Sequence, residues 1–193
     1  MKLRAIDLTL SAVFVALMAV GANVTSLLVI GGVPITLQTF FGILAGLILG
    51  SRLGAISMVA YTCIGLVGVP IFSKFQGGPG ALISPTFGFI LSYILVAYVV
   101  GKMVEASSSK NRFVIAALVG MVINYVIGTN WMYAAMKLWA EAPEAFSYGV
   151  AWAWMAVPLP KDIVLSVVAG VVAPRLYKNI QKSTGSLKQK SAA

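Results

Sequence analysis

The chain has 193 residues, of which 60% are apolar and only 10% are charged, and its mean hydropathy is +0.95. A soluble domain of this size cannot bury so much apolar surface, so the composition indicates a membrane protein. The 14 basic and 5 acidic side chains give a net charge of +9. With one cysteine, Cys63, and no histidine, the sequence excludes intrachain disulfides, Cys/His metal sites and histidine-based catalysis.

Six apolar stretches are expected to cross the membrane as α-helices, because about 20 apolar residues span the hydrocarbon core. They cover residues 6–30, 36–49, 53–69, 85–104, 113–138 and 160–177. Glycine and proline separate the first two stretches, at Gly31, Gly32 and Pro34, and Gly50 precedes the third. Residues 71–84 are expected to form a loop, and the aromatic connection 139–159 is expected to lie along a membrane interface, with room for a short helix.

The chain is therefore predicted to be an all-α membrane protein built as a six-transmembrane-helix bundle. Residues 1–178 form this single domain, and residues 179–193 are expected to be a disordered polar tail in the cytoplasm. The N-terminus resembles the start of a signal peptide, but without a convincing cleavage pattern it is interpreted as a retained first helix.

The distribution of basic residues predicts the orientation of the bundle. Three of the 14 basic residues, Lys74, Lys137 and Lys161, fall on one side of the predicted membrane, and the remaining basic residues fall on the other. Because cytoplasmic loops carry the excess of lysine and arginine, both termini are expected to be cytoplasmic. The positive charge is explained by topology, so no nucleic-acid partner is expected.

The polar residues within or beside the apolar stretches gather in the segments expected on the outer side. They lie after the first turn (Thr36, Gln38, Thr39), in the third loop (Ser73, Lys74, Gln76, Gly77, Gly78), on the fifth stretch (Asn124, Thr129, Asn130) and at the start of the last (Lys161, Asp162). Each has a structural alternative: the glycines suit tight turns, Gln38 and Asn130 suit bonds between helices, and Asp162 suits a helix cap. Ionisable residues at the membrane edge nevertheless favour a functional site.

Ala12 and Ala16 form an Ala-x-x-x-Ala pattern in the first stretch. Small residues four positions apart share one helix face and allow another helix to approach closely. Packing within this bundle and docking of a partner helix are both compatible with the pattern.

An ordered series of motifs runs through most of the chain. It consists of VPITLQT (33–39), AG (45–46), LGSRLG (49–54), GVPIFS (68–73), GGPG (77–80) and PTFGF (85–89). This series resembles the BioY family, the biotin-capturing S components of energy-coupling factor (ECF) transporters. The resemblance implies a pocket near the outer face, a multi-pass protein of the bacterial cytoplasmic membrane, and partnership with a transmembrane coupling subunit and two ATPase subunits. It also implies that Ala12 and Ala16 contact the coupling subunit.

Biotin is then the expected ligand, with no cofactor for catalysis and no metal. The expected substrate-binding residues are Thr36, Gln38, Phe72, Lys74, Phe75, Gln76, Gly78, Tyr125, Asn130, Lys161 and Asp162. Gln38 and Asp162 are suited to the ureido group, and Lys74 or Lys161 to the carboxylate. Many relatives carry Pro-Gly-Asp followed three residues later by lysine, whereas here Leu165 occupies that position and Lys161 precedes Asp162. Phe89 likewise stands where the family often has tyrosine.

Three alternatives remain open at this point. The chain is compatible with an S component for another vitamin or small molecule, with an intramembrane enzyme, and with a structural or regulatory membrane protein. An enzyme is disfavoured, because Asp162 is the single carboxylate expected near the pocket and histidine is absent.

Overall fold

The computed structural model describes residues 4–24, 26, 29–30, 33–106 and 109–190. Within these ranges the fold is all-helical apart from one short hairpin. The α-helices are α1 (Ala5–Asn23), α2 (Gln38–Leu66), α3 (Phe87–Glu105), α4 (Lys110–Leu138), α5 (Tyr148–Met155) and α6 (Leu159–Lys190). Strands β1 (Val29–Ile30) and β2 (Val33–Pro34) pair antiparallel before α2, and two 3-10 helices, η1 (Ser73–Phe75) and η2 (Pro79–Ile83), lie between α2 and α3.

Helix α2 reverses direction at Gly50, which has the non-helical angles φ 80° and ψ −178°. The Nε2 atom of Gln38 donates a hydrogen bond to the Tyr61 hydroxyl over 3.0 Å, although 23 positions separate the two residues. In a straight helix a separation of 23 residues would place them about 35 Å apart. Residues 38–49 and 51–66 are therefore two antiparallel arms, as the interruption at Gly50 predicts.

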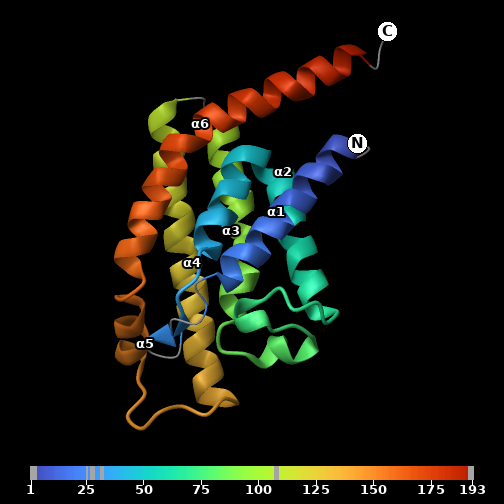
Figure 1. Ribbon diagram of the computed structural model, residues 1–193. Coiled ribbons are helices and arrows are strands. Elements are labelled where there is room, and N and C mark those ends of the chain that lie inside the picture. The colour runs from blue at the N-terminus through green and yellow to red at the C-terminus, as the bar shows by residue number, and fades with distance from the viewer. Residues whose placement is uncertain (1–3, 25, 27–28, 31–32, 107–108, 191–193) are drawn as a thin grey trace.

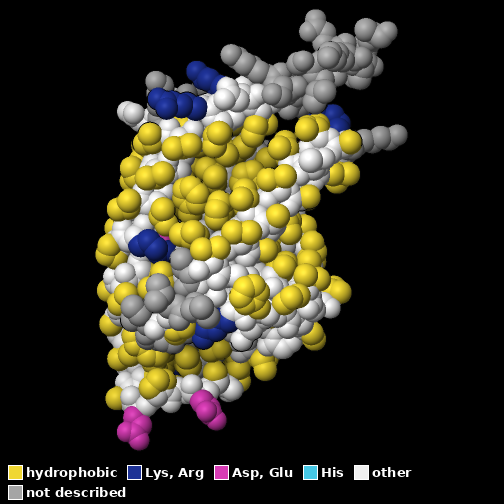
Figure 2. Space-filling model, in the orientation of Figure 1, with side chains coloured by type: hydrophobic (Ala, Val, Ile, Leu, Met, Phe, Trp, Pro, Cys, Tyr) yellow, Lys and Arg dark blue, Asp and Glu magenta, His cyan; other side chains and the backbone are white. Residues whose placement is uncertain are grey.

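Five helices of the described chain are long and apolar enough to cross a membrane: α1, α2, α3, α4 and α6. They are arranged as a bundle with both termini at one end, while α5, η1 and η2 lie at the other end (Figure 1). On the face that Figure 2 shows, apolar side chains cover much of the side of the bundle, and acidic side chains are visible at the end opposite the termini. The molecule is thus a multi-pass membrane protein with a loop-covered end.

Glycines allow the arms of α2 to pack closely on α3. A Cβ atom on Gly101 would lie 2.1 Å from the Ser51 backbone nitrogen, and one on Gly46 would lie 2.6 Å from the Ala97 carbonyl oxygen. Such close approach is characteristic of helix packing in membranes, where small residues bring backbones together. It fixes α2 and α3 as the centre of the bundle.

The two largest differences from the predicted boundaries lie at the ends of α1 and α6. The first stretch was expected to run to residue 30, but α1 ends at Asn23, and Val29 and Ile30 form β1, as suits β-branched residues. The glycines expected to interrupt it, Gly31 and Gly32, lie outside the described residues.

The last helix, α6, continues to Lys190, so residues 179–190, expected to be disordered, are helical here. The division of the chain at residue 178 stays a prediction.

Candidate ligand-binding cavity

A cavity lies between the helices at the loop-covered end of the bundle. Its lining comes from the segment before α2, from α2, α3, α4, α5 and α6, and from the α2–α3 and α5–α6 connections. The lining residues are Pro34, Thr36, Gln38, Thr39, Phe72, Ser73, Gln76, Ala81, Ser84, Thr86, Phe89, Ile90, Tyr93, Asn124, Tyr125, Met155, Pro158, Lys161 and Asp162. Aromatic and aliphatic walls with a few convergent polar groups are typical of small-molecule sites.

Asp162 places a buried carboxylate at the cavity, in the first turn of α6. The Tyr125 hydroxyl on α4 donates a hydrogen bond of 2.7 Å to Asp162 Oδ2. Asp162 Oδ1 lies 2.7 Å from the Lys161 ammonium but accepts no bond of hydrogen-bonding geometry from the described residues. Tyr125 thus holds one oxygen of the carboxylate, and the Lys161 ammonium is the close neighbour of the other.

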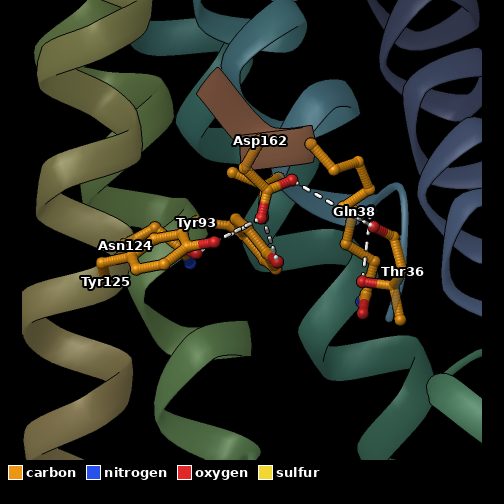
Figure 3. A network of polar contacts seen from close by, with 8 residues as sticks. Thr36, Gln38, Tyr93, Asn124, Tyr125 and Asp162 are labelled. Atoms are coloured by element: carbon orange, nitrogen blue, oxygen red, sulfur yellow. Dashed lines mark hydrogen bonds and ion pairs between the residues drawn. The ribbon is translucent and has the colours of Figure 1, made fainter. Parts of the chain in front are cut away.

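Lys161 reaches from α6 to the segment before α2, because its Nζ also donates to the Thr36 carbonyl oxygen over 2.5 Å. Figure 3 shows Asp162 between Tyr125 on one side and Gln38 with Thr36 on the other. The lysine and the aspartate are the only charged residues in the described lining of the cavity. Together they form a neutral pair at its edge.

Gln38 begins α2 and connects the two arms of that helix. Its amide donates to Tyr61, and the Tyr61 hydroxyl in turn donates to the Ile71 carbonyl oxygen over 2.8 Å. The Tyr61 ring also packs edge-on against Phe72, with ring centroids 5.5 Å apart. The bond between helix arms expected as an alternative role for Gln38 thus exists, and the same residue lines the cavity.

A second polar cluster, formed by Thr39, Ser92, Tyr93 and Asn124, joins α2, α3 and α4. Asn124 Nδ2 donates to Ser92 Oγ over 2.6 Å, and Asn124 Oδ1 accepts from Thr39 Oγ1 over 3.4 Å. The Thr39 and Tyr93 hydroxyls also lie 3.4 Å apart. Because buried polar groups are costly unless paired, this cluster fixes the position of the three helices around the cavity.

Seven of the eleven residues expected at the site line the cavity: Thr36, Gln38, Phe72, Gln76, Tyr125, Lys161 and Asp162. The other four, Lys74, Phe75, Gly78 and Asn130, lie outside the lining. Their assignment to ligand binding stays a prediction.

The contacts of these four residues explain their positions. Phe75 is 67% exposed, and its backbone N–H donates to Asn23 Oδ1. Gly78 adopts φ 95° and donates its N–H to the Gly65 carbonyl, which supports the tight-turn alternative. Lys74 is exposed with φ 61°. Asn130 accepts from the Tyr148 hydroxyl, and so links α4 to α5 rather than facing the cavity.

Tyr93 is the main lining residue that the sequence did not suggest. It lies in the middle of an apolar stretch, where tyrosine has no distinctive signal, and only the packing of α3 against α2 and α4 brings its hydroxyl to Thr39. Thr39 and Asn124 stood out as polar residues but were not assigned to the site. Their common feature is a position on apolar helices near the predicted outer side.

Ala12 and Ala16 are exposed on α1, whose buried face consists of Asp7, Ser11, Phe14, Met18, Gly21 and Ala22. Their pattern therefore does not serve packing within the described part of this chain. The face they occupy remains open to lipid or to another protein.

The comparisons with known proteins agree with this architecture. The solved structure described as the S-component for biotin from an ECF-type ABC transporter matches with a TM-score of 0.77, covering 89% of this chain and 90% of that one. At 22% sequence identity this match establishes the fold.

Relatives whose names state a function also match this chain in sequence. A putative biotin transporter, BioYB of Bacillus subtilis, is 46% identical over 95% of this chain and 94% of its own length. The biotin transporter BioY of Thermotoga maritima is 32% identical over 86% of this chain and 92% of its own. The model of the BioY family matches residues 1–182. This chain, with its loop-covered cavity and the lysine–aspartate pair at the edge of that cavity, belongs to the BioY family.

Proposed function

We propose that the chain is a biotin-binding S component of an ECF transporter, which captures biotin in the cavity and delivers it inward when coupled to an ATPase module. The observation that carries the proposal is the contact of the buried Tyr125 and Asp162 with the partly buried Lys161 at a cavity with apolar walls, in a member of this family. The named relatives are biotin transporters, which favours biotin over other vitamins.

The chemistry of the lining is complementary to biotin. Biotin has a ureido ring with two N–H donors and one carbonyl acceptor, a thioether ring, an aliphatic chain and a carboxylate. Asp162 Oδ1, which has the Lys161 ammonium as its neighbour, suits a ureido N–H, and the amide of Gln38 suits the ureido carbonyl. Phe72, Phe89 and Tyr93 provide walls for the rings and the chain.

Lys161 is the proposed partner of the biotin carboxylate. The sequence left Lys74 and Lys161 as alternatives, and the position of Lys161 in the lining favours it, since Lys74 lies outside. A charge-assisted bond from a partly buried ammonium is stronger than a bond between neutral groups. Lys161 thus takes the role for which many relatives use the lysine that this chain lacks at position 165.

The proposed orientation has six membrane crossings, with the two arms of α2 counted separately. Both termini then lie in the cytoplasm, and the cavity lies near the outer face of a bacterial cytoplasmic membrane. Two observations support this arrangement: the termini share one end of the bundle (Figure 1), and the basic residues of the sequence are concentrated there.

The exposed Ala12 and Ala16 are proposed to dock on the coupling subunit. The energy source must be a separate ATPase pair, because the sequence has no phosphate-binding loop of its own.

A competition assay on the purified protein tests the choice of ligand. Labelled biotin bound to the protein should be displaced by unlabelled biotin and not by a similar concentration of thiamine or riboflavin. Displacement by another vitamin at a lower concentration than biotin would assign the site to that vitamin instead.

A further inference from the structure

Lys161 makes two contacts that a bound ligand would disturb. Its Nζ lies 2.7 Å from Asp162 Oδ1 and donates to the Thr36 carbonyl oxygen over 2.5 Å. The lysine side chain is 29% exposed and the aspartate side chain 5%. One ammonium therefore neutralises the buried carboxylate and ties α6 to the segment that leads into α2.

The Lys161 ammonium lies next to Asp162 Oδ1, the acceptor atom that an N–H donor of the ligand would need. Asp162 Oδ2 already accepts from Tyr125, and Asp162 Oδ1 has the ammonium as its close neighbour without a hydrogen bond of good geometry. An N–H group of a ligand that approaches Asp162 Oδ1 competes with this ammonium for the same oxygen.

Charge balance decides which arrangement a carboxylate ligand prefers. The pair is neutral in the free cavity, and the described lining offers no second cation. If Lys161 stayed on Asp162, the ligand carboxylate would enter a partly buried site without a partner, which is costly. If Lys161 moves to the ligand, Asp162 keeps Tyr125 and gains the ligand N–H. The four-carbon stem of lysine allows this movement without a shift of α6.

We infer that Lys161 is an exchangeable internal counter-ion of Asp162. When biotin binds, the Lys161 ammonium leaves Asp162 and the Thr36 carbonyl oxygen and pairs with the biotin carboxylate instead. This inference rests on the proposed function. It makes Lys161 a specificity-determining residue, because only a ligand with an anionic group of its own compensates for the loss of the Lys161–Asp162 ion pair. It also couples binding to release of the segment before α2.

The test compares biotin with biotinol, in which a primary alcohol replaces the carboxylate. Dissociation constants of both ligands are measured for the purified wild-type protein and for Lys161→Met, which keeps the length of the side chain and removes its charge. Lys137→Met is the matched control, since Lys137 is exposed at the end of α4 and lies outside the cavity lining. Lys161→Arg restores the charge, and Lys161→Gln provides a second neutral variant if Lys161→Met does not fold.

The wild-type protein is expected to prefer biotin. In Lys161→Met the ratio of the biotinol to the biotin dissociation constant should fall at least about tenfold, since biotin loses a charged partner while biotinol no longer displaces one. Lys137→Met should keep the wild-type ratio, and Lys161→Arg should recover much of it.

Equal weakening of both ligands in the Lys161 variants would overturn the inference and leave Lys161 a structural role. Unchanged binding of both would show that Lys161 does not meet the ligand. If the wild-type protein binds neither compound, the proposed function itself fails, which is a separate result from loss of the ratio.

Discussion

The two oxygens of Asp162 serve different purposes at the level of single residues. Oδ2 is held by the Tyr125 hydroxyl, which fixes the rotation of the carboxylate, while Oδ1 remains directed to Lys161. A carboxylate held in place before binding loses less freedom when the ligand arrives, so Tyr125 is a positioning residue for the ligand site.

Replacing Tyr125 with phenylalanine removes this hydroxyl and keeps the ring. The affinity for biotin is expected to fall about tenfold, the usual effect of losing a hydrogen bond to a charged group. Calorimetric titration measures the change. Tyr148→Phe is the control, because the Tyr148 hydroxyl bonds to Asn130 outside the cavity and its loss should leave affinity unchanged. Equal effects of the two substitutions would refute the role given to Tyr125.

Asn124 has a structural role beside the ligand site. Its side chain is 1% exposed and bonds to Ser92, to Thr39 and to the Phe89 carbonyl. Asn124→Ala leaves these groups without a partner and should destabilise the protein by about 1–3 kcal/mol. A thermal unfolding curve in detergent should show a lower Tm, whereas Asn130→Ala should lower it less. A Tm equal to that of wild type would contradict this view of the cluster.

At the scale of helices, the turn between the two arms of α2 brings Gln38 to Tyr61. Gly50 adopts φ 80°, and Glu105 at the end of α3 accepts from the Ser51 N–H over 2.7 Å and from the Ser51 hydroxyl. The Glu105 carboxylate thus accepts from the first backbone N–H of the second arm, which has no partner within that arm, as an acidic group does at a helix N-terminus.

Gly50→Ala should weaken this turn by about 1–3 kcal/mol, because a residue with a Cβ is strained at φ 80° and ψ −178°, a region that essentially only glycine adopts. The added Cβ would also lie 2.7 Å from Glu105 Oε1. A lower Tm is the expected result. In Gly149→Ala the new Cβ has no neighbour closer than 3.9 Å and φ is not positive, so its Tm should stay near that of wild type. If Gly50→Ala left the Tm unchanged, residues other than Gly50 would have to determine the turn.

Local sequence predicted much of the element pattern, since the runs of apolar residues and the break at Gly50 follow from membrane thickness and helix propensity. The end of α1 at Asn23 did not follow, because valine and isoleucine suit both an apolar helix and the short strand β1. Tyr93 and the contact between Lys161 and Thr36 depend on packing between distant segments, which periodicity does not encode. Several polar residues of the cavity could therefore be predicted from the sequence, whereas the remaining lining and its contacts follow only from the fold.

At the scale of the whole molecule, α4 anchors the loop-covered end. The indole N–H groups of Trp131 and Trp139 donate to the Ser84 and Ile83 carbonyls, over 3.1 and 2.7 Å. These bonds hold the end of η2 beside the cavity, and the Tyr148 bond to Asn130 holds α5 to the same helix. The opposite end of the bundle carries both termini (Figure 1). Ala12 and Ala16 form an exposed alanine face on α1.

Bulky side chains on that face should separate docking from binding. Ala12→Leu combined with Ala16→Leu is expected to abolish biotin uptake and co-purification with the coupling subunit, while biotin binding by the isolated protein stays intact, because neither alanine contacts the cavity. Ala153→Leu, at an exposed position on α5, is the control and should permit co-purification. Loss of folding in the double variant would favour a packing role within the bundle.

The measurement that tests the central claim most directly is the equilibrium affinity of the purified protein for biotin, with Asp162→Asn measured beside it. The wild-type dissociation constant is predicted to lie below about 1 μM, and Asp162→Asn, which replaces the charged acceptor, is predicted to raise it at least about tenfold. Glu144→Gln makes the same chemical change at an exposed position of the α4–α5 connection and should leave the affinity as it is. Absence of biotin binding below about 1 μM, or equal affinity of Asp162→Asn and wild type, would contradict biotin capture by this cavity.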